Sequence, residues 1–260
     1  MRNKLTKELA VCGFNAVSAV ARERAGLINR LFLREDRLPS FTKVCKALAE
    51  RKRPYKLCGN EELERLCKSP HHQGVVAMIE EPEVPNLTRE DLNEWTKEGK
   101  TGLVLHSVGN DLNLGAIVRS AAFFEAHFIV LSEGDTEARL TTGAYRVAEG
   151  GMEFVVFRKI RDTAAFLRDA SKTLITIAAE PRARWRIQDL GTIIQEKKSA
   201  LLPSGGKRPG IALVVGNEET GLPEPVKAHC LALVRIPGTG AIESLNVAQA
   251  AALFLHELYK

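Results

Sequence analysis

The chain alternates short apolar runs with amphipathic stretches, and this alternation starts twice along its length. In the first 80 residues, apolar positions at helical spacing alternate with runs rich in β-branched residues, which favour strands. This pattern predicts a small α/β domain with helices over 13–25, 40–53 and 60–69 and strands over 28–35, 55–59 and 73–80.

A second and more strongly apolar series begins near residue 102. Continuous β-branched runs are typical of strands that are covered on both faces, as in a parallel sheet flanked by helices. The series predicts an α/β domain with about six strands, over 102–108, 127–132, 154–160, 173–179, 211–217 and 231–237. The stretch 196–210, EKKSALLPSGGKRPG, has the Gly, Ser, Pro and Lys content of a mobile loop.

A polar and acidic stretch separates the two series. Residues 81–100 hold Pro82 and Pro85 ahead of a short possible helix, and they have the composition of a linker. The predicted domains are therefore 1–80 and 101–260, joined by the linker 81–100.

Charge, cysteine content and the lack of long apolar runs indicate the kind of partner and the cellular compartment. Residues 1–80 carry 16 Lys and Arg against 9 Asp and Glu, whereas the remainder carries 21 against 23, so the basic excess lies in the first domain. Such an excess fits either a nucleic-acid partner or a solvated surface. The five scattered cysteines include no CxxC pair, which indicates reduced thiols. Without a long apolar run or a signal-peptide core, the sequence predicts a cytoplasmic protein.

Polar and glycine-rich segments follow three of the predicted strands. The carboxyl ends of parallel strands meet at one edge of a sheet, where helix N-termini offer free amides to polar ligands. The three segments are NDLNLGAIVR from Asn110, GNEETGL from Gly216 and IPGTGAIESLN from Ile236. Each segment alone could be a helix cap or a tight turn, but together they predict one site.

Other familiar sites are not supported. No GxGxxG follows the first strand of the second domain, which argues against a dinucleotide site, and GxxxxGK[ST] is absent. The adjacent His71 and His72 should point in different directions, so we expect no metal site and place them at the turn before the strand 73–80.

The three segments together resemble the SpoU family, the TrmH-like branch of the SPOUT class of RNA 2′-O-ribose methyltransferases. That family has N-x-G-x-x-x-R in its first motif, G-x-E-x-x-G-L in its second and I-P-x-x-G-x-x-x-S-L-N-V in its third. This chain supplies Asn113, Gly115 and Arg119; Gly216, Glu218, Gly221 and Leu222; and Ile236, Pro237, Gly240, Ser244, Leu245, Asn246 and Val247. The first 80 residues resemble, more weakly, the small substrate-binding domain of several members, a fold akin to a ribosomal RNA-binding protein.

The resemblance implies a parallel-sheet SPOUT domain whose C-terminal chain makes a trefoil knot, and a homodimer that binds RNA. It also implies S-adenosyl-L-methionine as the cofactor. The residues it assigns to the cofactor are Gly216, Asn217, Gly221, Ile236, Pro237, Gly240, Ser244, Leu245 and Asn246.

The catalytic residues that the resemblance implies are Asn113, Arg119, Glu218, Ser244 and Asn246. Arg119 would come from the partner subunit. Because a guanidinium keeps its proton in proteins, binding a phosphate or polarising the ribose hydroxyl is easier to defend than acting as a base.

The chain departs from the family pattern at Asn110–Asn113, where many relatives have Asp-Pro-x-Asn, at Glu219, where Gly is frequent, and at Gly238, where Met is common. Glu219 adds negative charge near a site for RNA. The segment RARWR, 182–186, either contacts RNA phosphates and offsets that charge or is a solvated loop.

The sequence leaves three functions open. The first is methylation of a ribose 2′-hydroxyl of rRNA or tRNA, the second is an RNA-binding or assembly role with little catalysis, and the third is RNA base methylation on the same scaffold.

Overall fold

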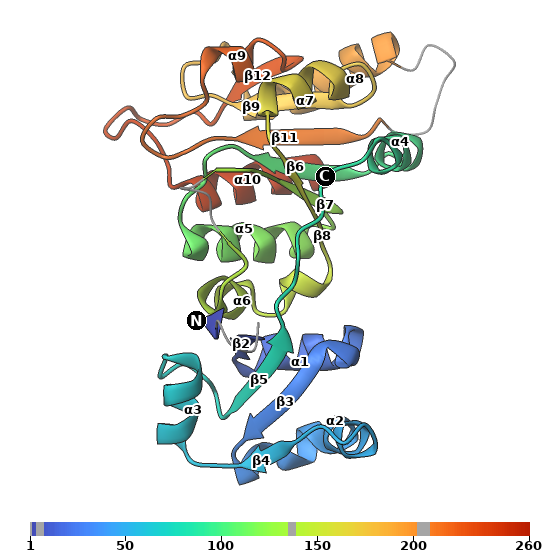
Figure 1. Cartoon of the computed structure of the whole chain (residues 1–260). Coiled ribbons are helices and arrows are strands. Elements are labelled where there is room, and N and C mark those ends of the chain that lie inside the picture. The colour runs from blue at the N-terminus through green and yellow to red at the C-terminus, as the bar shows by residue number, and fades with distance from the viewer. Residues whose placement is uncertain (1, 4–7, 135–138, 202–208) are drawn as a thin grey trace. The chain divides into compact units, whose positions relative to one another are not determined.

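The computed structural model describes residues 2–3, 8–134, 139–201 and 209–260, which form two compact units (Figure 1). Unit 1 comprises Met1–Glu83, Leu114–Arg119 and Arg139–Phe154. Unit 2 comprises Val84–Asn113, Ser120–Ala138 and Val155–Lys260. One helix, α5 (Asp111–Phe123), therefore contributes residues to both units.

Unit 1 contains a five-stranded mixed sheet in the order β1-β2-β5-β3-β4, in which only β3 and β4 run parallel. Its strands are β1 (Arg2–Asn3), β2 (Glu8–Cys12), β3 (Ile28–Leu33), β4 (Tyr55–Leu57) and β5 (Val75–Glu80). Its helices are α1 (Phe14–Glu23), α2 (Leu38–Glu50), α3 (Asn60–Cys67) and α6 (Thr142–Ala148), with 3-10 turns at Ala25–Leu27, Glu35–Arg37 and Gly151–Glu153.

The predicted helices and strands of the first 80 residues are confirmed, and the strands β1 and β2 are additions to them. All five residues of β2 are buried, and Cys12 at its end lies in one apolar cluster with Cys67 of α3. The five cysteines are free thiols. His72 is buried, and its Nδ1 accepts a hydrogen bond from the backbone N of Gly74 at 3.0 Å, at the turn where the sequence places it.

Unit 2 contains a seven-stranded sheet in which all neighbouring strands run parallel, in the order β10-β12-β9-β11-β6-β7-β8. The strands are β6 (Thr101–Leu105), β7 (Phe128–Ser132), β8 (Val156–Ile160), β9 (Ile175–Ala179), β10 (Trp185–Arg186), β11 (Ile211–Val215) and β12 (Ala232–Arg235). The parallel α/β prediction is confirmed, and β10 adds a two-residue edge strand to the six expected strands. The trefoil knot stays a prediction.

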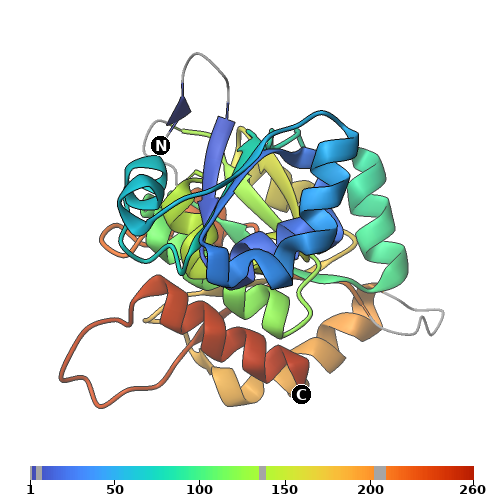
Figure 2. The same cartoon turned by 90° about the horizontal axis from the view of Figure 1, so that it is seen from below.

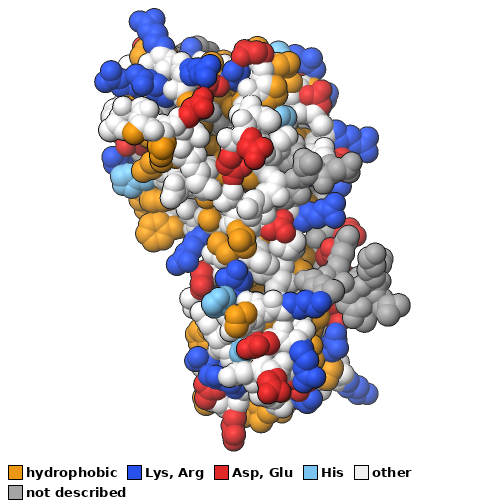
Figure 3. Space-filling view, turned by 90° about the vertical axis from the view of Figure 1, so that its left-hand side faces the viewer, with side chains coloured by type: hydrophobic (Ala, Val, Ile, Leu, Met, Phe, Trp, Pro, Cys, Tyr) orange, Lys and Arg blue, Asp and Glu red, His pale blue; other side chains and the backbone are white. Residues whose placement is uncertain are grey.

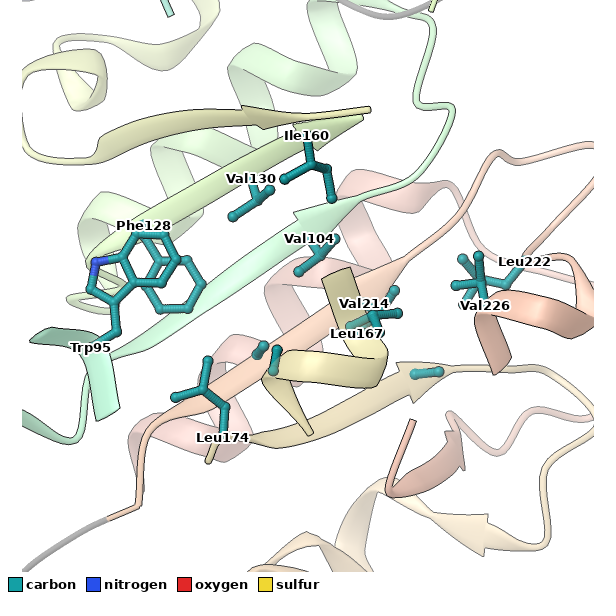
Figure 4. Close-up of a cluster of buried hydrophobic side chains, with 13 residues drawn as sticks. Trp95, Val104, Phe128, Val130, Ile160, Leu167, Leu174, Val214, Leu222 and Val226 are labelled. Atoms are coloured by element: carbon teal, nitrogen blue, oxygen red, sulfur yellow. The ribbon is translucent and has the colours of Figure 1, made fainter. Parts of the chain in front are cut away.

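Helices cover both faces of this sheet. On one face, α4 (Arg89–Glu98), α7 (Thr163–Ala170) and α9 (Glu224–Lys227) enclose the apolar core of Figure 4. The indole of Trp95 stacks on Phe128 there, with 3.8 Å between the ring centroids. On the other face, α10 (Val247–Tyr259) lies beside α8 (Leu190–Leu201), as Figure 2 shows. A 3-10 turn, Ile187–Asp189, precedes α8.

The stretch 81–100, predicted as a linker, includes α4 and is anchored to the sheet. The backbone N of Leu87 donates to the carbonyl O of Lys159 at 3.0 Å, and the backbone N of Lys159 donates to Pro85 at 2.9 Å. This segment therefore occupies hydrogen-bonding groups of the edge strand β8. The domain boundaries at 80 and 101 stay a prediction.

The mobile-loop prediction for 196–210 is wrong over 196–201, which belong to α8. The apolar pair Ala200 and Leu201 follows Ile193 and Ile194 at helical spacing, with polar residues between the two pairs. Residues 202–208 lie outside the described residues.

Within the described ranges, no helix combines the length and apolar character needed to cross a membrane. The same part of the chain contains no group of three or more His, Cys, Asp or Glu side chains arranged to hold a metal ion.

Candidate functional site

The first motif begins where β6 runs into α5. The backbone N of His106 donates to the carbonyl of Val215 at 2.9 Å, which keeps the loops after β6 and β11 together. Ser107 adopts a left-handed conformation with φ 55°. The helix is capped by Asn110, whose Oδ1 accepts from the backbone N of Leu112 at 2.8 Å. Since Asn110 is the cap, the side chain of Asn113 is available for other contacts.

Asn113 joins the three motif segments. Its Nδ2 donates a hydrogen bond to Oε1 of Glu218, in the loop after β11. Its Oδ1 accepts from Nδ2 of Asn246, at the start of α10, at 3.1 Å. The structure therefore brings together Asn113, Glu218 and Asn246, one residue from each motif.

Asn217 organises the loop after β11. Its Nδ2 donates to the carbonyl O of Ser107 at 2.9 Å, and its Oδ1 accepts from the backbone N of Glu219 at 2.9 Å and of Thr220 at 3.1 Å. The turn closes with a hydrogen bond from the backbone N of Gly221 to the Asn217 carbonyl, at 2.9 Å. Asn217 thus fixes this turn to the end of β6.

Gly216 is required by the same turn. A Cβ built on Gly216 would lie 2.6 Å from the carbonyl oxygen of Gly221, closer than real Cβ atoms approach backbone. Gly221 itself has φ 66°, which favours glycine. Leu222, the last residue of the motif, is buried in the core under α9.

The third motif is an exposed loop that leads into α10. Residues 237–246 are all exposed, and from Pro237 to Leu245 no backbone-to-backbone hydrogen bond joins this loop to another described residue. Two large apolar side chains lie open, with exposed fractions of 73% for Ile242 and 40% for Leu245. The Ser244 side chain makes no hydrogen bond to a described residue. The loop thus presents free backbone donors and acceptors together with apolar surface.

Asn246 ends this loop and begins the helix. Its Oδ1 accepts from the backbone N of Ala248 at 2.9 Å and of Gln249 at 3.4 Å, so it caps α10 while its Nδ2 reaches Asn113. One side chain therefore serves both as a cap and as a link between motifs. Ile236 and Gly240 lie in the same loop, and Gly240 has φ 84°.

The remaining residues of the first motif play different parts. Gly115 packs α5 closely on α6, since an added Cβ would lie 2.6 Å from the carbonyl oxygen of Ala144. Arg119 is exposed, and it forms no ion pair with a described residue. The guanidinium of Arg119 is thus free to meet a ligand or another chain.

Sequence reasoning missed two residues after β6. The ring Nδ1 of His106 lies 3.0 Å from Oγ1 of Thr163, and burial lowers the pKa of His106 from its ordinary value. Ser107 contributes its carbonyl to Asn217 and its backbone N to Oγ of Ser132, at 3.0 Å. The only hint in the sequence is that His106 and Ser107 follow directly after a predicted strand. Contacts made by backbone atoms do not depend on the residue type, so the sequence does not reveal them.

Comparison with known proteins gives two family matches. The model described as the SpoU rRNA Methylase family matches residues 100–256, and the model described as RNA 2′-O ribose methyltransferase substrate binding matches residues 10–85. Similar proteins include the 23S rRNA (guanosine-2′-O-)-methyltransferase RlmB of Ralstonia nicotianae, 31% identical over 257 residues, with 97% of this chain and 96% of the relative covered. The RlmB protein of Acinetobacter baylyi is 33% identical over 202 residues, 76% of this chain and 74% of the relative.

Similar solved structures include the AdoMet-bound rRNA methyltransferase from Sinorhizobium meliloti, with a TM-score of 0.74 at 22% identity. The match covers 98% of this chain and 87% of that one. The SpoU methyltransferase AviRb from Streptomyces viridochromogenes, in complex with AdoMet, has a TM-score of 0.68 at 19% identity, covering 98% and 91%. At these identities the likeness establishes the fold.

Proposed function

The chain belongs to the SpoU rRNA methylase family, and from this premise we propose that it transfers a methyl group from S-adenosylmethionine to a ribose 2′-hydroxyl of ribosomal RNA. The resemblance drawn from the three motifs is confirmed by the family models. Ribosomal RNA, and a guanosine within it, is favoured over tRNA because the full-length relative from Ralstonia nicotianae acts there. We also propose a cytoplasmic location, where such RNA is found.

The observation that carries the proposal is the link from Asn113 to Glu218 and Asn246. Asn113, in the first turn of α5, bonds to two polar side chains more than 100 residues further along the chain, at the carboxyl ends of β6 and β11. A parallel sheet collects ligands at this edge. A merely structural loop cluster would not need every one of these residues.

The loops have the character that the cofactor requires. An added Cβ at Gly221, Gly238 or Gly240 would meet nothing within 4 Å, so bare backbone faces open space there. The backbone groups of 237–245, which make no backbone-to-backbone hydrogen bond to a described residue, and the exposed side chain of Leu245 offer hydrogen bonds and an apolar contact. We assign cofactor binding to Gly216, Asn217, Gly221, Ile236, Pro237, Gly240, Ser244, Leu245 and Asn246.

S-adenosylmethionine supplies a methyl group on a positively charged sulfur, so the protein's main task is to position the ribose hydroxyl. In our proposal Asn113 and Ser244 align the ribose. Glu218 holds the amide of Asn113 in one orientation, since that amide donates to its carboxylate. Asn246 fixes the same amide from its other end.

Arg119 takes the phosphate next to the target nucleotide or polarises the hydroxyl, because a guanidinium keeps its proton. Arg119 follows Asn113 by six residues, which in a helix correspond to about 9 Å of rise and about 240° of rotation. The two side chains therefore project from different sides of α5. Arg119 instead shares the exposed side of α5 with Leu112 and Phe123, which are 48% and 78% exposed. This arrangement supports our proposal that Arg119 completes the site of a partner subunit.

The surface for such a dimer lies on α5 and α10. Phe124 contacts the rings of Tyr259 and His256, while Phe123, Leu253 and Tyr259 remain exposed. Large exposed apolar patches mark protein interfaces. We therefore propose a homodimer in which these aromatic side chains are buried.

Mass spectrometry of ribosomal RNA incubated with the protein and S-adenosylmethionine tests the function. A 2′-O-methylribose is the expected product. A methylated base, product on tRNA alone, or no product would each contradict the proposal; the last would favour an RNA-binding or assembly role. Arg119→Ala should abolish methylation and leave cofactor affinity nearly intact in calorimetry, with Arg168→Ala, on the exposed side of α7, as the matched control.

A further inference from the structure

A short segment between β9 and α8 exposes an unusual set of side chains. Arg182, Arg184, Trp185 and Arg186 are all exposed, and Trp185 has 37% of its surface open. The guanidinium of Arg184 lies 6.0 Å from the centre of the Trp185 ring. Tryptophan is large and apolar, so leaving it open forgoes stabilisation that burial would give. An exposed indole beside three arginines suits a partner that is both planar and anionic.

The sheet places this segment beside the third motif. Trp185 pairs with Val234 and Arg186 with Arg235 in the parallel ladder of β10 and β12. The next residue of the chain after Arg235 is Ile236, which opens the candidate cofactor loop. The segment is therefore tied directly to the strand from which that loop leaves.

A second contact links the segment to the far end of the same loop. Nη2 of Arg182 lies 3.3 Å from Oε1 of Glu243, the residue before Ser244. The Arg182 and Glu243 side chains are 86% and 80% exposed, so the pair is weak and an RNA phosphate can replace it. Strand pairing and this ion pair thus place the arginines along the border of the proposed site.

The segment has few acidic groups to compete with RNA. Arg184 and Arg186 form no ion pair with any residue that the structure describes. Asp189 accepts from the backbone N of Arg186 at 2.9 Å, and Glu180 pairs with Lys227 at 3.3 Å. Figure 3 looks onto the loops at the carboxyl ends of the strands, and Lys and Arg side chains lie at the top of this view among Asp, Glu and hydrophobic side chains.

We propose that Arg182, Arg184, Trp185 and Arg186 form a platform for single-stranded RNA next to the methylated nucleotide. A base stacks on the indole of Trp185, and the arginines bind the flanking phosphates. This inference rests on the proposed function. A ribose whose hydroxyl must be presented to a methyl donor is most accessible in an unpaired strand, whose bases are free to stack. Stacking on an aromatic ring accepts any base, so the platform adds affinity without sequence preference.

Binding of a fluorescently labelled 12-nucleotide single-stranded RNA, with a duplex of equal length as comparison, tests the platform in the full-length protein. Trp185→Ala should weaken single-strand binding by about 5- to 150-fold, the range for losing one stacked base. Trp185→Phe keeps an aromatic ring and should stay within about threefold of the wild-type affinity. Unchanged binding by Trp185→Ala, or an equal loss for the duplex, would overturn the proposal.

The salt dependence of binding tests the arginines. Removing two phosphate contacts should reduce the slope of log K against log salt by about 1.4 for a single strand. We expect this of the double variant Arg184→Gln and Arg186→Gln, and no change for Arg168→Gln on α7. An unchanged slope in the double variant would contradict phosphate binding by these arginines.

Tryptophan fluorescence reports the stacking directly. The chain has two tryptophans, and Trp95 is buried in the core. RNA should quench the emission of Trp185, and Trp185→Phe should bind RNA without this quench. If the quench persists in Trp185→Phe, the base does not stack there and the proposal fails.

Two further measurements separate this inference from the proposed function. Trp185→Ala should raise KM for RNA while leaving kcat at saturating RNA and the affinity for S-adenosylmethionine unchanged. If the wild-type protein binds RNA through Trp185 but makes no 2′-O-methylribose, the proposed function fails and the platform stands. If the wild-type protein methylates RNA and the variants bind and react normally, the platform fails and the function stands.

Discussion

Asn246 donates a hydrogen bond from Nδ2 to Oδ1 of Asn113 at 3.1 Å, across 133 positions of sequence. The same Asn246 side chain caps α10 through its Oδ1. Helix stability and site geometry are thus combined in one amide, and its two functions can be separated by substitution.

Asn246→Asp should keep the cap but lose the donor to Asn113, whereas Asn246→Ala loses both. We expect Asn246→Ala to lower the free energy of unfolding by about 1 kcal/mol, the usual worth of a cap, and Asn246→Asp to lower it much less. Both should reduce methyl transfer at least about fivefold, since both lose the hydrogen bond to Asn113 and one hydrogen bond is worth about 1 kcal/mol. Urea denaturation and initial rates check this; full activity of Asn246→Asp would show that the donor is dispensable.

Gly216→Ala should distort the turn after β11, because its Cβ would meet the Gly221 carbonyl at 2.6 Å. We expect affinity for S-adenosylmethionine, measured by calorimetry, to fall at least about tenfold, or 1.4 kcal/mol. Gly191→Ala is the matched control, since its Cβ meets nothing within 4 Å and it lies in α8, outside the loops assigned to the cofactor. Equal affinities for the two variants would show that the turn does not shape the cofactor site.

Gly115→Ala should destabilise the contact of α5 with α6, since the added Cβ would lie 2.6 Å from the Ala144 carbonyl. Overpacking of this kind costs about 1 to 3 kcal/mol of unfolding free energy. Gly191→Ala, in α8, meets nothing within 4 Å and should stabilise by about 0.5 kcal/mol through helix propensity. Chemical denaturation of the two variants checks the sign of each change, and a stabilising Gly115→Ala would contradict the packing argument.

Asp91 should make folding sensitive to acid. Nε and Nη2 of Arg158 donate to its two carboxylate oxygens at 2.8 and 2.7 Å, and these bonds lower the pKa of Asp91 in the folded chain. Stabilisation by a carboxyl with a lowered pKa is fully present above its unfolded pKa of about 4 and disappears as pH falls through the folded pKa. Asp91→Asn should therefore cost about 2 kcal/mol at pH 7 and less at pH 3.

Unfolding free energies at pH 7, 5 and 3 check this prediction. Asp169→Asn provides the control, because Asp169 pairs with Lys172 on the open surface and should change stability little at any pH. A loss in Asp91→Asn that is the same at all three pH values would mean that its ionisation is not what stabilises the fold.

The sequence predicted which loops meet but not how they bond. Alternating apolar runs and strand-end motifs were enough to place Asn113, Glu218 and Asn246 at one edge of a parallel sheet. Asn110 and Asn113 are both able to cap a helix, however, and only the structure assigns the cap to Asn110. Contacts of a backbone carbonyl, such as that of Ser107, leave no mark on the residue type.

The sequence did not predict two other features, because the local composition there does not match the role of the segment in tertiary packing. Residues 81–100 are polar and acidic, yet Trp95 projects from α4 into the core, where it stacks on Phe128. A single aromatic residue in a polar helix is weak sequence evidence that the helix packs on a core, although its side chain buries a large surface. Likewise β10 has two exposed residues, and only its pairing with β12 identifies it as a strand.

The margins of the seven-stranded sheet constrain how copies of the protein associate. At β8, hydrogen bonds between Lys159 and the chain at Pro85 and Leu87 occupy backbone groups that a foreign strand would otherwise use. The opposite margin, β10, is two residues long and too short to template another chain. Self-association by strand addition is therefore disfavoured at this sheet, which leaves side-chain surfaces of the helices as the route to an ordered assembly.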